Sequence, residues 1–192
     1  MSSEKLNRGN HIIPLRDYMN AKFDEGTRRR MYEGLSPDTQ EMLKKVAHED
    51  WYPTRMVSEM HSAIFNARGN PQQGYEDMIA GGAAVAEYSV NTFMRLLIKL
   101  MTPEMLAKKW PAIWLKSHNF GAMETELDPN DPRKLKLMLS DVEDYHYIGP
   151  TVMGFLSFSL KAMGKDTAKV DELDNPDKTR KNSRRYDFII TW

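Results

Sequence analysis

The residues in this chain most able to do chemistry are its five histidines, which are His11, His48, His61, His118 and His146. No two of them are four residues apart, and the sequence His-Glu-x-x-His does not occur, so no helical pair of metal ligands is encoded. Glu49 and Asp50 directly follow His48, but adjacent residues of a helix point apart. This segment therefore favours a solvated helix end, and we predict that the chain has no metal site.

Two polar segments have some of the residues of known binding motifs. Asp128, Asn130 and Asp131 offer oxygen ligands for Ca²⁺, but two prolines and the lack of a downstream Glu favour a turn. Arg180 and Arg184 have the Arg-x-x-x-Arg spacing that cyclic-dinucleotide receptors use, and Arg forks suit phosphates. The acidic residues close by indicate instead a surface loop that neutralises its own charge.

No motif for catalysis is present. The chain has neither the Gly-x-Ser-x-Gly turn of a serine nucleophile nor the Gly-x-x-x-x-Gly-Lys loop that cradles phosphates. It has no cysteine, which excludes disulfides, thiolate metal sites and a cysteine nucleophile. We predict that the protein is not an enzyme.

An aromatic and methionine-rich interior remains as the candidate ligand site. The chain has 14 methionines, whose flexible side chains fill irregular cores or line adaptable binding surfaces. Buried Trp and Tyr need a partner for their N–H and O–H groups, so some of these residues are expected to border a pocket with a few polar points. Packing in the core is the alternative for each of them. The candidate ligand-binding residues are Trp110, Trp114, His118, Tyr145, Tyr147 and Met153.

The charge balance limits the range of partners. Lys plus Arg and Asp plus Glu both total 27, so the net charge is zero and broad binding to nucleic acid or to anionic membranes is not favoured. The polar start of the chain lacks a signal peptide, and no run approaches the roughly 20 apolar residues of a spanning helix. We predict a cytoplasmic protein without a membrane span.

The first part of the chain has the spacing of helices. Ser36-Pro37 and Thr102-Pro103 each place a capping hydroxyl before a proline at the first helical position. Residues 75–101 keep helical spacing as one long helix or a coupled pair, and Gly81-Gly82 leaves a small-residue patch there. A neighbouring helix is the expected occupant of that patch, and a ligand is the alternative. Pro111 is expected to kink or split the helix that follows Thr102.

The second part alternates with the period of strands. Residues 123–127 and 135–139 predict a hairpin around the turn at Asp128, and 167–173 with 184–192 predict a second one. A helix over residues 152–163 lies between them. The fold class is therefore α+β, a helical layer packed on a four-stranded antiparallel sheet, in the order helices and then β-β-α-β-β. We predict an N-terminal extension with a short helix over residues 1–35, disordered over 1–10, and a single domain over 36–192.

Over residues 37–192 the chain resembles a superfamily of bacterial ligand-binding domains. The resemblance is carried by Trp51-Tyr52-Pro53, the proline-broken helix from Phe93 to Trp114, the hairpin at Gly121, the passage from Ser140 to Gly164, and the closing strand. The superfamily includes vinyl-reductase-type domains, haem–nitric-oxide-binding domains and TRAPP-like subunits. The chain looks closest to a Myxococcales paralogous family of unknown function. The resemblance implies a compact, often dimeric domain that holds a small or lipid-like molecule between helices and sheet.

Haem is the most specific ligand that this resemblance suggests, and the sequence argues against it. Haem-binding members carry Tyr-x-Ser-x-Arg on the strand that clamps the propionates. This chain has Met138-Leu139-Ser140-Asp141-Val142 there, so only Ser140 matches, and the bidentate partner of the propionates is lost. His118 is the available proximal ligand, but it lies nearer Ser140 than the ligand of the family does. We predict no cofactor.

Together these observations predict a non-catalytic, cytoplasmic sensory or regulatory domain that binds a small apolar or amphipathic molecule. The alternative is a structural or adaptor protein that acts through a homodimer or partner interface without a ligand. A homodimer is expected on either hypothesis.

Overall fold

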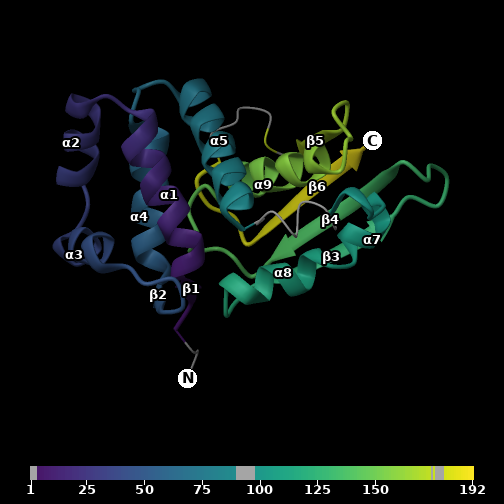
Figure 1. Ribbon diagram of the computed structural model, residues 1–192, viewed down its shortest axis with the longest axis horizontal. Helices are drawn as coiled ribbons and strands as arrows, with labels where there is room; N and C mark the ends of the chain where they lie inside the picture. Colours follow the sequence, from purple (N-terminus) through teal and green to yellow (C-terminus); the bar gives the residue numbers. More distant parts are fainter. Residues whose placement is uncertain (1–3, 90–97, 174, 176–179) are drawn as a thin grey trace.

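The structure is a computed structural model that describes residues 4–89, 98–173, 175 and 180–192. A helical half is followed by a half that contains a four-stranded sheet (Figure 1). The helices are α1 (Gly9–Lys22), α2 (Glu25–Glu33), α3 (Pro37–Lys45), α4 (Thr54–Asn66), α5 (Pro71–Ser89), α7 (Pro103–Ala107), α8 (Trp110–Ser117) and α9 (Ile148–Ala162). The strands are β1 (Leu6–Arg8), β2 (Trp51–Pro53), β3 (Ala122–Leu127), β4 (Lys134–Ser140), β5 (Lys169–Glu172) and β6 (Arg185–Thr191).

Capping residues and prolines set the helix boundaries where the sequence predicts them. The side chain of Ser36 accepts a hydrogen bond from the backbone N–H of Thr39 at the start of α3, and Thr102 does the same for Met105 at the start of α7. Pro111 splits the predicted helix, because α7 ends at Ala107 and α8 begins at Trp110 with the proline in its first turn. The predicted continuation of α5 through residues 90–97 lies outside the described residues.

The glycine patch of α5 is a site of close helix packing, as predicted. A Cβ added to Gly82 would lie 1.9 Å from the carbonyl oxygen of Thr151 in α9, and one added to Gly154 would lie 1.8 Å from that of Ile79 in α5. Only glycine permits this approach, so the two helices pack backbone to backbone. This contact fixes the distance between the helical half and the sheet.

The sheet has the strand order β3-β4-β6-β5, and every neighbouring pair is antiparallel. Its register pairs Leu137 with Phe188 on adjacent strands. Both side chains are fully buried, as are those of Leu135, Leu139, Tyr186 and Ile190. Because β6 lies between β4 and β5, the apolar final strand is inside the sheet. The predicted α+β class and the order β-β-α-β-β are confirmed.

The start of the chain is more ordered than predicted. Residues 6–8 form β1, which pairs with β2 in a two-stranded antiparallel sheet, so the expectation of disorder over residues 1–10 is wrong from Leu6 onward. The partner strand is distant in sequence, and the local polar composition carries no sign of it. In α1, Ile12, Leu15 and Met19 are fully buried in the same core as the later elements. The boundary between an extension and a domain at residue 36 stays a prediction.

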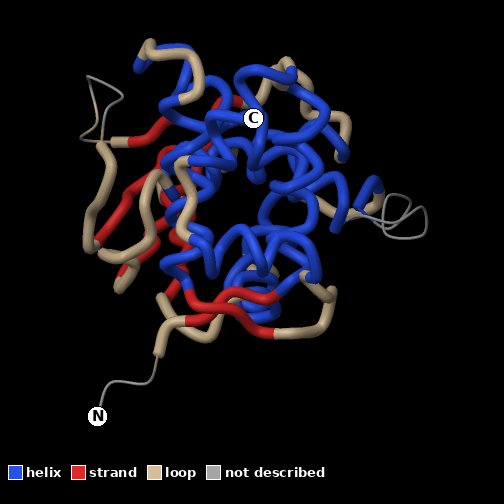
Figure 2. The backbone as a smooth tube through the Cα atoms, turned by 90° about the vertical axis from the view of Figure 1, so that its left-hand side faces the viewer, coloured by secondary structure: helices blue, strands red, loops and turns tan. Residues whose placement is uncertain are grey.

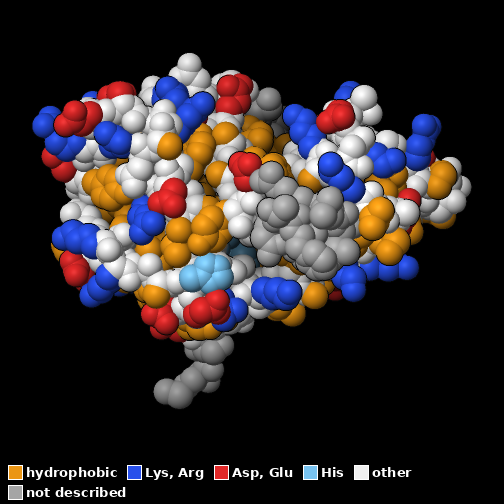
Figure 3. All heavy atoms as spheres, viewed as in Figure 1, with side chains coloured by type: hydrophobic (Ala, Val, Ile, Leu, Met, Phe, Trp, Pro, Cys, Tyr) orange, Lys and Arg blue, Asp and Glu red, His pale blue; other side chains and the backbone are white. Residues whose placement is uncertain are grey.

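The overall arrangement is a helical side and a sheet side (Figure 2). On the face drawn in Figure 3, acidic and basic side chains are intermingled, in keeping with the net charge of zero. Among the described residues, no helix is long and apolar enough to cross a membrane.

Candidate ligand-binding site

Half of the predicted ligand-binding residues surround one buried cavity of about 60 Å³. Trp110, Trp114 and His118 line it from α8 and the residue after it. The remaining walls come from α1, α5, the start of β3 and α9, and they are mainly apolar; they include Val85, Ile148, Val152, Phe155 and Leu156. The cavity thus lies between the helices and the sheet, where the sequence predicted a pocket with few polar points.

His118 is the polar residue of this cavity that is best placed to bind a ligand. Its Nδ1 lies 3.0 Å from the carbonyl oxygen of Trp114, so Nδ1 carries the proton and Nε2 keeps its lone pair. Nε2 is buried and has no hydrogen-bond partner among the described residues. The ring stacks on the indole of Trp114, with centroids 3.7 Å apart. Burial is the main cause that lowers the pKa of His118 to about 3, so its imidazole is neutral near pH 7.

Behind the cavity lies a chain of buried polar groups. The amide Nδ2 of Asn7 donates to the hydroxyl of Tyr145 at 2.9 Å, and that oxygen lies 2.8 Å from Nε2 of His11. The hydroxyl therefore donates its own proton to His11, whose Nδ1 carries the remaining proton of the ring. The rings of His11 and His118 are edge to face, with centroids 5.0 Å apart. Asn7, His11 and Tyr145 thus connect the first strand of the chain to the cavity wall.

His61 is the third buried imidazole of this region. Its Nδ1 donates to the carbonyl of His146 at 2.8 Å, which leaves Nε2 buried without a partner, and its ring stacks on Tyr145 at 5.2 Å. Burial lowers the pKa of His61 to about 4 and holds that of His11 well below the usual value, with the neighbouring imidazoles lowering the pKa of His11 further. The three imidazoles are accordingly neutral near pH 7. Within the described residues no metal-binding group of three histidines and carboxylates converges.

The other predicted site residues lie apart from the cavity or behind it. Tyr145 is in the polar chain just described and does not line the cavity. Tyr147 stacks on Phe65 with centroids 4.1 Å apart, and Met153 accepts a hydrogen bond from Tyr75. The assignment of Trp110, Trp114 and His118 to a ligand stays a prediction. His11 and Asn7 could not be found from the sequence, because their partners are more than a hundred residues away.

The side chains of the Asp128 segment and of the arginine segment bond to neighbouring residues of the chain. Asp128 accepts a hydrogen bond from the backbone N–H of Asn130 and pairs with Lys134, which confirms the turn. The arginine segment neutralises its charge in part: Arg184 pairs with Asp141 at 3.5 Å and Arg185 with Asp187 at 2.8 Å, whereas Lys181 has no carboxylate partner among the described residues.

Arg180 differs from these arginines because it is not a surface residue. Its guanidinium lies 3.6 Å from the almost fully buried carboxylate of Glu172 and sits over the ring of Tyr186. Arg180 thus fastens its loop to β5 and β6.

Solved structures that resemble this fold include haem–nitric-oxide-binding (H-NOX) proteins. An H-NOX protein from S. oneidensis in the Fe(II)NO state is 14% identical, covers 95% of this chain and 97% of its own, and has a TM-score of 0.67. The Fe(II) unliganded H-NOX protein from K. algicida is 11% identical, with coverages of 96% and 95% and a TM-score of 0.65. The IWP-051-bound H-NOX from Shewanella woodyi has a TM-score of 0.61 at 11% identity, with coverages of 95% and 93%. No protein-family model matches the sequence, and no curated protein matches it. At these identities the likeness establishes the H-NOX fold.

The prediction of no cofactor is contradicted by these neighbours. They include H-NOX proteins in Fe(II), Fe(II)NO and Fe(II)CO states, and one structure described by its haem redox potential and porphyrin distortion. Two observations on the sequence spoke against haem: the propionate motif is incomplete, and His118 lies nearer Ser140 than the ligand of the family does. Ligation of the iron is a separate interaction that depends on a single nitrogen, and the absence of Tyr at position 138 and of Arg at position 142 does not bear on it.

The residues around the cavity include a histidine that could ligate the iron of haem, but they lack the Tyr and Arg that bind the propionates in haem-binding members of the superfamily. His118 offers a neutral imidazole with a free Nε2 and a hydrogen-bonded Nδ1, as metal-ligating histidines have. Met138 and Val142 provide no cation for the propionates, and Val142 is fully buried in the core. The cavity is small against the roughly 300–1,000 Å³ of typical ligand pockets, so a porphyrin requires the surrounding helices to separate.

Proposed function

We propose that the protein is a small-molecule-sensing domain that holds its ligand in the cavity at His118. The observation that carries the proposal is the buried, neutral His118 with an unpartnered Nε2 in an apolar wall. A buried polar atom without a partner is costly, so a position that keeps one calls for an explanation. A ligand that bonds to Nε2 supplies it.

Haem is the first candidate for that ligand. It is supported by the haem proteins of this fold and by the tautomer of His118, which suits an axial ligand. When bound, haem supplies an iron that takes up a diatomic gas. This chain's own residues would then do three things: His118 would hold the group, Trp114 would fix the ring by stacking and by its carbonyl, and the apolar wall of α9 would exclude water.

Titration with haemin, followed by visible absorbance, tests this assignment. The wild-type protein is expected to give a saturable Soret band at one haem per chain. His118→Ala removes the axial nitrogen and should abolish or shift the band, whereas His48→Ala changes an exposed histidine and should leave it as it is. Equal bands in all three proteins would contradict the role of His118, and no saturable band in the wild type would reject haem.

A small apolar molecule is the second candidate, favoured by the size and lining of the cavity. Engineered apolar cavities of similar character stay dry and take up xenon or benzene. Xenon under pressure should therefore shift the side-chain methyl resonances of Val85 and Val152, which line the cavity, and leave those of Val170, which is buried elsewhere. Unchanged spectra at saturating xenon would exclude this use of the cavity.

We also retain the homodimer as a proposal. Leu100, Met105 and Leu115, close together in the sequence around α7 and α8, are between about half and four-fifths exposed, and contiguous patches of exposed apolar side chains mark interaction sites. In sedimentation experiments the wild type should then be a dimer, and Leu115→Lys, which places a charge in the proposed interface, should be a monomer. A monomeric wild type at micromolar concentration would contradict the proposal and with it the adaptor hypothesis in its dimeric form.

A further inference from the structure

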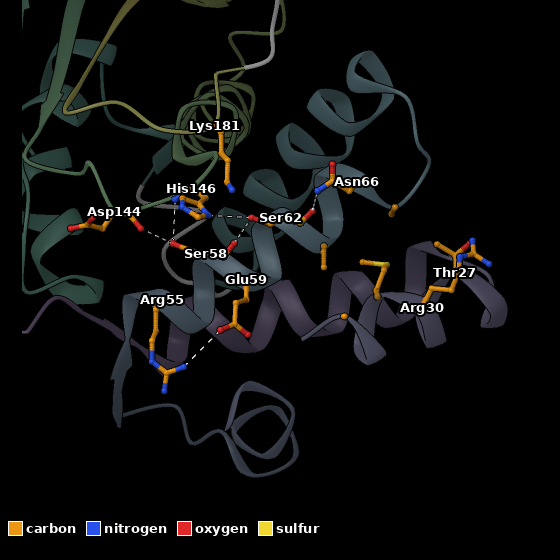
Figure 4. Close-up of a pocket in the computed structure, with 14 residues that line it drawn as sticks. Thr27, Arg30, Arg55, Ser58, Glu59, Ser62, Asn66, Asp144, His146 and Lys181 are labelled. Atoms are coloured by element: carbon orange, nitrogen blue, oxygen red, sulfur yellow. Dashed lines mark hydrogen bonds and ion pairs between the residues drawn. The ribbon is translucent and has the colours of Figure 1, made fainter. Parts of the chain in front are cut away.

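A second and larger pocket lies on the helical half of the molecule, away from His118. It is a groove of about 840 Å³ between α2 and α4 on one side and residues 144–146 with Lys181 on the other (Figure 4). Its volume is in the range of small-molecule sites. The groove shares no lining residue with the cavity at His118.

The charges of the groove are unevenly matched. Arg55 is held by Asp38 at 2.9 Å and Glu59 at 3.7 Å, and Asp144 is held by Lys5 at 3.3 Å. Lys181 has no carboxylate partner within the described part of the chain, although its backbone carbonyl accepts a hydrogen bond from Tyr147. Its side chain extends from the loop toward His146 and Ser62 (Figure 4). Among the described residues, two cations of the groove therefore have no carboxylate partner, Arg30 and Lys181, and Lys181 is the one that extends toward His146 (Figure 4).

The groups near Lys181 are already arranged by a hydrogen-bond network. Ser62 donates its hydroxyl proton to the carbonyl of Ser58 at 2.8 Å, so its oxygen accepts from Nδ1 of His146 at 3.2 Å. The backbone N–H of His146 in turn donates to the hydroxyl of Ser58 at 3.2 Å. This network holds the ring of His146 through its Nδ1, so its Nε2 is the nitrogen that does not bond to Ser62. This nitrogen becomes a second donor beside Lys181 when the ring is protonated.

The segment that carries His146 is held rigidly. Tyr145 is fully buried, whereas its neighbours Asp144 and His146 line the groove, so alternate side chains of the segment point to opposite sides. Tyr147 has a left-handed backbone with φ of 51°, and Asp141 has one with φ of 60°. Non-glycine residues in this conformation persist where the surrounding structure fixes them, often at ligand sites. The groove wall is thus set in place before any ligand arrives.

The groove also has an apolar part. It is formed by Ala63 of α4, Ala67 directly after that helix and Met31 of α2, with Asn66 and Thr27 as polar neighbours, and Arg30 lies at the α2 side of the groove. We propose that this groove is a second ligand site, which binds a small amphipathic anion whose carboxylate or phosphate group meets Lys181 and His146 and whose apolar part lies against α4. This proposal does not depend on haem or on the cavity at His118.

Binding should strengthen as the pH falls. Burial is the largest cause that lowers the pKa of His146, Lys181 lowers it further, and Asp144 opposes them. The other charged groups that line the groove are Arg30, Arg55 and Glu59. An anion beside Lys181 raises the pKa of His146, so the complex takes up a proton and the affinity rises from pH 8 to pH 6.

Titration with hexanoate, followed by two-dimensional amide NMR, tests the proposal. Saturable shifts are expected at Ser62, His146 and Lys181, and hexan-1-ol, which lacks the charge, should give much weaker ones. Lys181→Gln should raise the Kd for hexanoate about fivefold, the size of an exposed ion pair. Lys161→Gln removes an exposed lysine of α9 outside the groove and should leave the Kd unchanged. His146→Gln should remove the pH dependence.

Two results would overturn the inference. One is the absence of saturable shifts at these three residues with hexanoate at any pH from 6 to 8. The other is an equal Kd in the wild type and in Lys181→Gln. Both are read on the groove itself, so neither depends on whether His118 binds haem, and His118→Ala should bind hexanoate as the wild type does.

Discussion

The cavity at His118 and the groove at Lys181 differ in how their polar groups are placed: those of the cavity are buried and neutral, and those of the groove are charged and near the surface. The cavity is small and mainly apolar, and its imidazoles are neutral because burial lowers their pKa values. The groove is large and open, and its charges are exposed or paired at the surface. Residues 144–146 contribute to both, because Tyr145 belongs to the buried polar chain while Asp144 and His146 line the groove.

This difference shows which residues hold the fold and which are free to serve a ligand. A buried polar group costs stability unless it is hydrogen-bonded, whereas an exposed charge contributes little. Changes around the cavity should therefore alter stability strongly, and changes in the groove should alter binding alone.

Lowering the pH should destabilise the protein through its buried histidines. His61 and His118 have pKa values of about 4 and about 3 in the folded state, against a usual value of 6.5. The unfolded chain binds more protons below pH 6.5, so stability is complete above that pH and is lost as the pH falls toward 4 and then 3. The free energy of unfolding should fall by on the order of 4 kcal/mol between pH 7 and pH 5.

Urea unfolding at several pH values measures this loss. His118→Gln should reduce the slope of stability against pH by about one proton, and exposed His48→Gln should leave the slope as in the wild type. Stability that does not change between pH 7 and pH 5 would contradict the neutral state of the buried histidines. If His118→Gln fails to fold, the ¹⁵N shifts of the wild-type imidazoles report the same protonation states.

Gly82→Ala should break the contact between α5 and α9 that closes one side of the cavity. The new Cβ meets a backbone carbonyl, which cannot rotate away, so we expect a loss of about 3 kcal/mol in the free energy of unfolding. Gly34→Ala is the matched control, since its Cβ has ordinary contacts of 3.4 Å and 3.5 Å. Equal midpoints of thermal unfolding for the two variants would mean that the helices are farther apart than described.

Tyr145→Phe should remove the central link of the buried polar chain. It leaves the amide of Asn7 and Nε2 of His11 without their partner, at a cost of about 2 kcal/mol in the free energy of unfolding. Tyr147→Phe changes the same residue type two positions on, where no hydrogen bond of the hydroxyl is found in the described structure, and should cost less than about 0.5 kcal/mol. Denaturant titrations that reverse this order would contradict the assigned chain.

The sequence predicted the parts of the molecule that depend on local chemistry. Capping residues before proline located the starts of α3 and α7, alternation located the strands, and Gly82 indicated a close helix contact. The cavity was predicted only in part, because its histidines come from distant elements and only tertiary packing brings them together. The strand pairing of residues 6–8 was missed for the same reason.

The prediction of no cofactor is wrong for a different reason. It rested on the strand motif that binds the propionates and on the short sequence distance between His118 and Ser140. A motif that binds the propionates describes one end of the cofactor, and the nitrogen that would ligate the iron comes from another element. The buried state of Nε2 of His118 is a tertiary property that no spacing in the sequence reveals.

Lys181→Gln should have the smallest effect on stability, and it tests the groove side of the contrast. The ammonium is exposed and has no carboxylate partner in the described part of the chain, so its loss should change the free energy of unfolding by less than about 0.5 kcal/mol. The backbone bond from Tyr147 to the carbonyl of residue 181 does not depend on the side chain and is kept. Denaturation at pH 7 measures the change, with Lys161→Gln as the matched exposed lysine. A loss comparable to that of Tyr145→Phe would mean that Lys181 holds the fold, and the groove would then lack a cation that is free to bind a ligand.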